Sequence, residues 1–322
     1  MRNIFLITIL IIAALATAEA QQIHQLSNYI LNDFAFNPAV AGKNPDDLVL
    51  KGTFRKQWAG GFNGDEPTTF MFSAHSNMNQ KKTVGLGMML YSDKTGPTER
   101  LGAQLAYSYH IPLEDTKRNF LALGISANII SYTLNFDKID VLEVSDPTIL
   151  MNNENKTTFD ANFGAYLHGP DYWLGVSAMQ LIQSRLDLGG QTLTGEELGV
   201  SLATHFYGSA GYKIDAGENL DLIPSVMVKI VQNVPLHYEL NLRAMYQEQY
   251  WVGVGYRAED AISLMLGADL AKGFNFAYSY DLISSAINDV SSGSHEIVIG
   301  YDYKWQKGPM KAKPFKYKET HL

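Results

Sequence analysis

The sequence contains no cysteine among its 322 residues. Disulfide bridges, thiolate zinc sites and cysteine nucleophiles are therefore excluded for this chain. An exported protein gains nothing from stray thiols, and a large β-barrel needs no disulfide to hold it together.

Charge is also scarce, because Asp, Glu, Lys and Arg make up only 18% of the residues and the formal net charge is −8. An acidic chain lacks the cationic surface that binds phosphate backbones, so we expect no nucleic-acid partner. The HExxH and GxSxG patterns do not occur in the sequence. We expect no enzyme, no cofactor and no metal centre. A barrel hydrolase stays open as an alternative, since a triad is recognised by geometry and not by sequence.

Long apolar runs are confined to the N-terminus. Residues 4–15 are apolar apart from Thr8, and Ala18-Glu19-Ala20 fits a signal-peptidase site. The run is shorter than the roughly 20 residues that a helix needs to cross a bilayer. We therefore expect residues 1–20 to be a cleaved secretion signal, with Gln21 as the first mature residue. The alternative is a buried N-terminal helix.

From residue 48 onward, apolar and polar residues alternate with a period of two, which indicates β-strands. In residues 101–111, for example, Leu105 and Tyr109 lie on one face while Gln104 and His110 lie on the other. We count about fourteen such segments of about 9–11 residues, the length that crosses a bilayer at barrel tilt. They begin near Leu48, Thr68, Lys82, Thr98, Arg118, Phe159, Tyr172, Leu198, Leu220, Leu236, Tyr250, Ala261, Phe274 and Ser294.

The connections between these segments differ in length on the two sides. Short ones alternate with long ones such as residues 59–67, 136–158, 182–197 and 283–293. Short periplasmic turns and long outer loops are typical of outer-membrane proteins. We predict an all-β fold: a transmembrane antiparallel outer-membrane β-barrel over residues 48–305, with both termini periplasmic. A soluble all-β protein is the alternative, because alternation marks any half-buried sheet.

Residues 21–47 precede the barrel and are predicted to form a plug-like segment. Apolar residues between Ile23 and Leu31 have helix-like spacing, and Asn37-Pro38 should end that helix. We expect the segment to fold into or across the periplasmic mouth and to touch the strand ends near His75 and His110. The residues assigned to the plug are Tyr29, Phe34, Asn37, Pro38 and Gly42.

Two further predictions concern charged residues. The first and last strands must meet to close the barrel, and Arg55 and Glu296 both lie on polar faces near the outer ends of these strands. We predict an ion pair between them inside the lumen. The tail, residues 306–322, is basic and interrupted by prolines, and it is either a solvated end or a docking peptide for a periplasmic partner. The docking residues would be Lys311, Lys313, Phe315, Lys316, Tyr317 and Lys318.

An ordered set of short motifs spans the mature chain and resembles the PorP/SprF family of Bacteroidetes outer-membrane proteins. The loop at residues 57–62 and the long basic tail depart from the pattern. The motifs are Asn28-Tyr29, residues 37–42, 55–58, 67–69, 73–75, 93–97 and 107–113, His295-Glu296-Ile297 and Gly300-Tyr301.

The resemblance implies a barrel that works with the type IX secretion system in secretion or surface attachment of cargo such as a gliding adhesin. Its expected partners are periplasmic and outer-membrane secretion components, the secreted cargo protein and membrane lipid. A passive channel or small-solute transporter is the alternative, since a barrel of about fourteen strands is wide enough for an open lumen.

Overall fold

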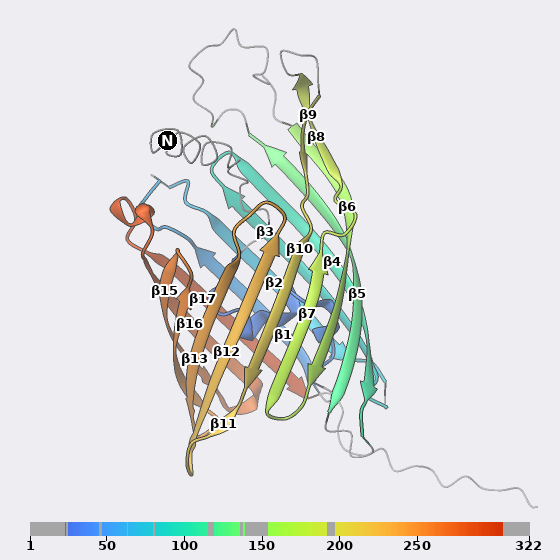
Figure 1. Ribbon diagram of the computed structural model, residues 1–322, viewed down its shortest axis with the longest axis vertical. Helices are drawn as coiled ribbons and strands as arrows, with labels where there is room; N and C mark the ends of the chain where they lie inside the picture. The colour runs from blue at the N-terminus through green and yellow to red at the C-terminus, as the bar shows by residue number, and fades with distance from the viewer. Residues whose placement is uncertain are drawn as a thin grey trace, which may run out of the picture.

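The computed structural model describes residues 23, 25–44, 47–62, 64–79, 81–114, 119–135, 138, 154–191 and 197–304. They form a closed antiparallel β-barrel of fourteen strands (Figure 1). In these ranges no helix is both long and apolar enough to cross a membrane.

Neighbouring strands of the barrel pair in sequence order, and β1 pairs with β17 to close the ring. A two-residue strand, β11 (Ile214–Asp215), extends one turn and is not part of the fourteen. The barrel strands are β1 (Asp47–Lys56), β2 (Thr68–Asn77), β3 (Val84–Thr95), β4 (Thr98–Pro112), β5 (Phe120–Leu134), β6 (Glu154–His168), β7 (Tyr172–Met179), β10 (His205–Tyr212), β12 (Leu220–Val231), β13 (His237–Tyr246), β14 (Tyr250–Arg257), β15 (Ala261–Asp269), β16 (Phe274–Ile283) and β17 (Ser294–Lys304).

The predicted fold class and strand number are confirmed, but one predicted strand is wrong. Leu198 lies in β9 (Glu197–Ser201), which pairs with β8 (Arg185–Gln191) in a separate two-stranded sheet. The eighth barrel strand is β10, which begins at His205. Alternation marks any paired strand and does not tell which sheet the strand joins, so the sequence could not separate a loop hairpin from the wall.

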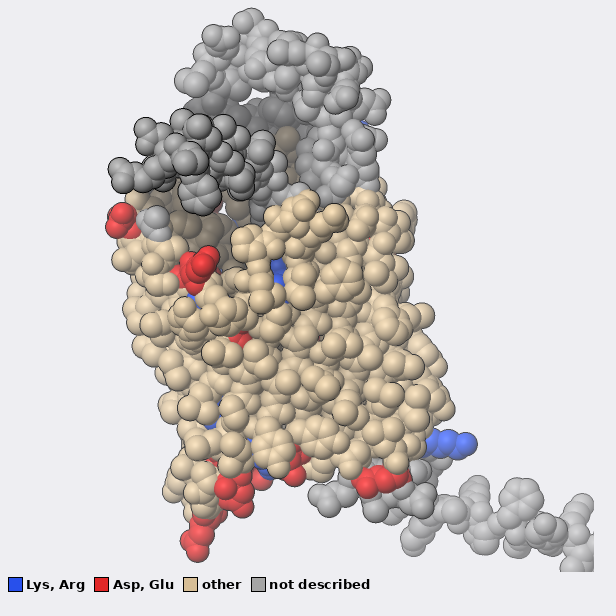
Figure 2. Space-filling view, viewed as in Figure 1, with Lys and Arg blue, Asp and Glu red and all other residues tan. Residues whose placement is uncertain are grey.

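Side chains are distributed inside out relative to a soluble protein. On β4, Leu105 is 69% exposed while Gln104 and His110 are each only 2% exposed. The same alternation recurs around the barrel, so its outer face is apolar and its lumen is polar. Figure 2 agrees: on the face shown, charged side chains lie mainly toward the two ends, and the middle is almost free of them.

The two ends of the barrel are named here by their connections. The short-turn end carries residues 78–83, 113–119, 169–171, 213–219, 247–249 and 270–273. The long-loop end carries residues 57–67, 135–153, 180–204 and 284–293, together with three short connections, 96–97, 232–236 and 258–260. Long connections on one side only are the asymmetry of outer-membrane barrels.

The N-terminal segment, residues 25–44, runs inside the barrel and is the blue ribbon behind the strands of Figure 1. It starts at the long-loop end, where Gln25 Nε2 lies 3.2 Å from His237 Nε2, and descends to β1 at the short-turn end. The last strand ends at Lys304, which pairs with Asp47 at the short-turn end. The described chain therefore starts at the long-loop end and finishes at the short-turn end. Residues 1–22 and 305–322 lie outside the described residues, so the location of both termini on the periplasmic side stays a prediction. The apolar spacing of residues 23–31 carried no information on the direction of the segment.

A charge placed on the outer face tests the membrane belt. Leu105→Arg should destabilise the folded barrel in bilayers by roughly 2–4 kcal/mol, because the guanidinium would enter the hydrocarbon region. Met78→Arg is the control: Met78 is 49% exposed but lies in a turn beyond β2, and its cost should be about 0–1 kcal/mol. Reversible denaturant unfolding in lipid vesicles measures both values. Equal costs would contradict a lipid-facing position for Leu105.

Candidate functional site

The lumen is filled by the N-terminal segment, which we call the plug (residues 25–44). Leu26, Tyr29, Phe34 and Val40 are 0–2% exposed, so each is almost fully buried. Burial of one such side chain stabilises the folded state by roughly 1.5–3 kcal/mol. The wall residues packed against the plug are Met71, Met89, Ala106, Ala122, Tyr166, Met179 and Tyr207.

The plug is built from two short 3₁₀ helices, η1 (Tyr29–Ala35) and η2 (Pro38–Val40). The predicted helix is thus present only from Tyr29 onward, and Asn37-Pro38 lies between the two helices. Asn37 caps η2, because its side-chain oxygen accepts a hydrogen bond from Ala39 N at 2.9 Å. Its Nδ2 donates to Ala165 O at 3.1 Å and Val176 O at 3.2 Å, which ties the cap to β6 and β7.

Two histidines hold the lower part of the plug near the short-turn end. Gly42 N donates to His75 Nδ1 at 3.3 Å, and His110 Nε2 lies 2.8 Å from Ala41 O. A carbonyl oxygen only accepts, so His110 carries its proton on Nε2. Gly42 has φ +71°, and an added Cβ would lie 2.7 Å from Gly85 Cα. Both the left-handed backbone and the close approach therefore require glycine at residue 42.

One ion pair lies within the plug itself. Lys43 Nζ contacts Asp33 Oδ2, and Tyr166 Oη donates to the same oxygen at 3.2 Å. The pair joins η1 to the end of the plug, and Tyr166 ties it to β6.

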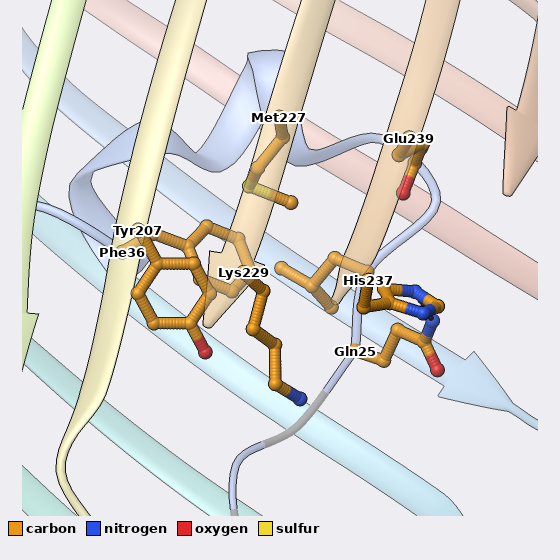
Figure 3. A pocket seen from close by; sticks show the side chains of 8 residues that line it. Gln25, Phe36, Tyr207, Met227, Lys229, His237 and Glu239 are labelled. Atoms are coloured by element: carbon orange, nitrogen blue, oxygen red, sulfur yellow. Dashed lines mark hydrogen bonds between the residues drawn. The ribbon is translucent and has the colours of Figure 1, made fainter. Parts of the chain in front are cut away.

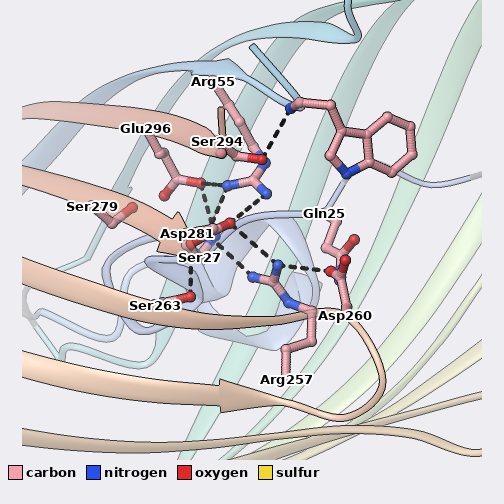
Figure 4. A network of polar contacts seen from close by, with 12 residues as sticks. Gln25, Ser27, Arg55, Arg257, Asp260, Ser263, Ser279, Asp281, Ser294 and Glu296 are labelled. Atoms are coloured by element: carbon pink, nitrogen blue, oxygen red, sulfur yellow. Dashed lines mark hydrogen bonds and ion pairs between the residues drawn. The ribbon is translucent and has the colours of Figure 1, made fainter. Parts of the chain in front are cut away.

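The upper part of the plug is held by a cluster of buried charges (Figure 4). Arg55 and Glu296, expected as a pair across the closure seam, are register partners on β1 and β17, and Nη1 lies 3.3 Å from Oε2. Arg55 Nη2 also lies 2.8 Å from Asp281 Oδ2 on β16. All three side chains are at most 2% exposed. Removal of one partner from such a cluster would leave an uncompensated buried charge.

Glu296 and Asp281 bind the plug as well as the arginine. Ser27 N and Asn28 N each donate to the Glu296 carboxylate at 2.8 Å. Ser27 Oγ donates to Asp281 at 2.8 Å and accepts from Arg55 Nη1 at 2.6 Å. The cluster thus joins three strands of the wall to the start of the plug.

A second arginine completes the cluster from β14. Arg257 Nε lies 3.3 Å from Glu239 Oε2, and its Nη1 lies 3.1 Å from Asp260 Oδ2 and 3.4 Å from Asp281 Oδ2. Its Nη2 donates to Ser27 Oγ at 3.1 Å. These four carboxylates contact arginine, and three of them, Glu296, Asp281 and Asp260, also accept hydrogen bonds from the plug. Their arrangement serves attachment of the plug, and it offers no nucleophile with a free general base beside it.

The predicted site residues are thus distributed over three places. Arg55 and Glu296 meet in the cluster, and Tyr29, Phe34, Asn37, Pro38 and Gly42 are all in the buried plug. The six tail residues from Lys311 to Lys318 lie outside the described residues. Sequence reasoning missed Ser27, Glu239, Arg257, Asp260 and Asp281. The available signal for the four strand and turn residues was a polar position on the lumenal face near the long-loop end. The sequence does not show which of these positions contact one another or the plug.

Release of the plug can be tested at Gly124 on β5. An added Cβ there would lie 2.3 Å from Ala39 N, so Gly124→Ala should push η2 away from the wall. We expect faster proteolysis of residues 37–44 and higher conductance in planar bilayers. Gly208→Ala on β10 is the matched control, because no atom lies within 4 Å of its added Cβ. Equal protection of the plug in both variants would argue against this close contact.

The cluster can be tested by neutralising its arginine. Arg55→Met should destabilise the barrel by about 3–5 kcal/mol, because Glu296 and Asp281 lose a buried partner. Lys213→Met removes an exposed ion pair with Asp171 at 3.7 Å and should cost less than about 1 kcal/mol. Denaturant unfolding of the two variants measures the difference. A cost for Arg55→Met no larger than for Lys213→Met would mean that the cluster does not hold the structure together.

Comparison with solved structures supports the barrel and nothing more specific. The CymD monoaromatic hydrocarbon channel aligns with a TM-score of 0.50 at 10% identity, over 89% of this chain and 95% of that one. A Pseudomonas aeruginosa FadL homologue aligns with a TM-score of 0.44 at 11% identity, over 80% of this chain and 89% of that one. At these identities only the fold is shared. No curated protein matches the chain.

The family model described as type IX secretion system membrane protein PorP/SprF matches residues 18–301. This range includes the plug, the barrel from β1 into β17, and all residues of the buried charge cluster. The description of the family is that of a membrane protein of a secretion system. The chain belongs to the PorP/SprF family of type IX secretion system membrane proteins.

Proposed function

We propose that this outer-membrane barrel supports secretion or cell-surface attachment of a cargo protein, such as a gliding adhesin, through protein–protein contacts. The observation that carries the proposal is the plug, which fills the lumen and is bound at both of its ends. The barrel therefore contributes to the type IX system through its surfaces and not through an open passage.

The plug also argues against the competing function, a passive channel or small-solute transporter. A channel needs a continuous water-filled path, whereas Leu26, Phe34 and Val40 close the lumen with apolar side chains. Solute passage would require the charge cluster and the histidine contacts to break together. CymD is described as a hydrocarbon channel, but its likeness to this chain extends only to the fold.

The ends of the barrel are the surfaces left for partners, since the belt between them faces lipid. We place the short-turn end in the periplasm, where the tail follows Lys304. This end carries acidic residues, among them Asp171, Asp215, Glu218 and Asp221, whereas the tail carries lysines. In our proposal Phe315 and Tyr317 anchor the tail on a periplasmic secretion component, and Lys311, Lys313, Lys316 and Lys318 steer it to an acidic surface.

Truncation after Gln306 tests the tail. The truncated protein should still insert and resist unfolding by heat on gels, because β17 ends at Lys304. Secretion of the cargo and co-purification of the periplasmic component from gently solubilised membranes should be lost. Phe315→Ala with Tyr317→Ala, in the full chain, should weaken both if the aromatic residues are the anchors. Normal secretion by the truncated protein would refute a docking role for the tail.

A further inference from the structure

A cavity of about 480 Å³ opens at the long-loop end, directly above the start of the plug. Its volume falls within the roughly 300–1,000 Å³ of small-molecule sites. The lining joins polar residues of the lumen, including His205, Lys229 and His237, to apolar residues of the loops. A smaller cavity beneath it shares Gln25, Lys229 and His237, so these three residues form the floor of the larger one (Figure 3).

Lys229 is the cation of this floor, and among the described residues it forms no ion pair or hydrogen bond. Figure 3 shows its side chain between Tyr207 and the neighbouring Gln25 and His237. The other lumenal cations differ: Arg55 and Arg257 contact carboxylates, Lys51 donates to Leu31 O, and Arg243 lies over the Trp251 ring, far from this cavity and toward the short-turn end of β13. Lys229 is therefore a lumenal cation at this cavity with bonding capacity left for an anion.

The acidic groups nearby do not supply that anion. Glu239 binds Arg257, and Asp260 binds Arg257 and accepts from Gln25 Nε2 at 3.4 Å. Glu259 is exposed at the rim of the cavity. One cation flanked by a neutral amide and an imidazole matches a group with a single negative charge better than a dianion.

The upper wall of the cavity is apolar and reaches over the rim of the barrel. Val231, Val234, Pro235 and Leu236 line it together with Trp58. The lining of the cavity includes both His237 and Tyr238. Consecutive residues of a strand point to opposite faces, so one of these two side chains faces the lumen and the other faces outward. The cavity thus continues from the lumen to the lipid-facing side, at the short connections 232–236 and 258–260, where the wall is low.

From this geometry we propose that the cavity binds an amphiphile with an apolar chain and a terminal carboxylate. The carboxylate accepts hydrogen bonds from Lys229, and the chain lies along residues 231–236 toward Tyr238. An open side facing lipid gives such a molecule a route from the membrane. This site is independent of the tail and of cargo binding.

Binding can be measured with dansyl-aminoundecanoate on the full-length barrel in amphipol, with the methyl ester of the same probe as the chemical control. The wild-type protein should bind the acid at least about tenfold more tightly than the ester, since a charge-assisted hydrogen bond is lost with the ester. Lys229→Met should remove this preference, whereas Lys229→Arg should retain it. Lys213→Met, at the short-turn end, should leave it unchanged.

The position of the probe has its own readout. Energy transfer from tryptophan to the dansyl group, measured at saturating probe for each protein, should fall in Trp58→Phe because Trp58 lines the cavity. Folding of each variant is checked by its heat-modifiable gel mobility. Equal affinity for acid and ester, or an unchanged preference in folded Lys229→Met, would overturn the proposal. If Lys229→Met did not fold, equal binding of acid and ester by the wild-type protein would still refute it.

Discussion

Closure of the sheet between β1 and β17 is the constraint on which the rest of the structure depends. Backbone groups at an open edge would face lipid without partners, so the first and last strands have to pair. Their register places Arg55 opposite Glu296 inside the wall. The same two residues then bind Ser27 and Asn28, so closure of the wall and attachment of the plug share one set of contacts.

A closed barrel of this width leaves polar side chains in its lumen that need hydrogen-bond partners, and the plug supplies them. The strands turn their apolar side chains to lipid, so polar side chains such as Gln104, Ser108 and His110 are gathered in the lumen. The plug brings backbone groups and polar side chains to meet them, and it buries its own apolar residues at the same time. Both ends are fixed by polar contacts, and so is the middle, where Asn37 donates to Ala165 O and Val176 O among packed apolar side chains. Polar contacts thereby set the position of the plug, and apolar burial supplies much of its stability.

The sequence predicts the barrel well because alternation is a local property. Strand faces on β4, the number of strands and the asymmetry of the connections all follow from short windows of residues. The β8–β9 hairpin and the path of the plug depend on which distant segments pair. The residues next to Leu198 or Ser27 in the sequence do not determine that pairing. The pairing of Arg55 with Glu296 could be predicted only because closure of the barrel requires their two strands to meet. Arg257 and Asp281 had no such rule, since their strands do not pair: β17 lies between Asp281 and Arg55, and β15 lies between Asp281 and Arg257.

The direction of the plug has a consequence for assembly. Its start lies at the long-loop end, while its junction with β1 lies at the short-turn end. The plug therefore runs through the whole length of the barrel lumen. A ring sealed while empty would have to be threaded from end to end by a segment that contains Arg-binding polar groups and bulky aromatic residues. A sheet that curls around the segment avoids this passage, because the β1–β17 seam can close last with Ser27 already beside Arg55. The topology therefore favours one order of folding: the plug is placed first, and the barrel wall then closes around it.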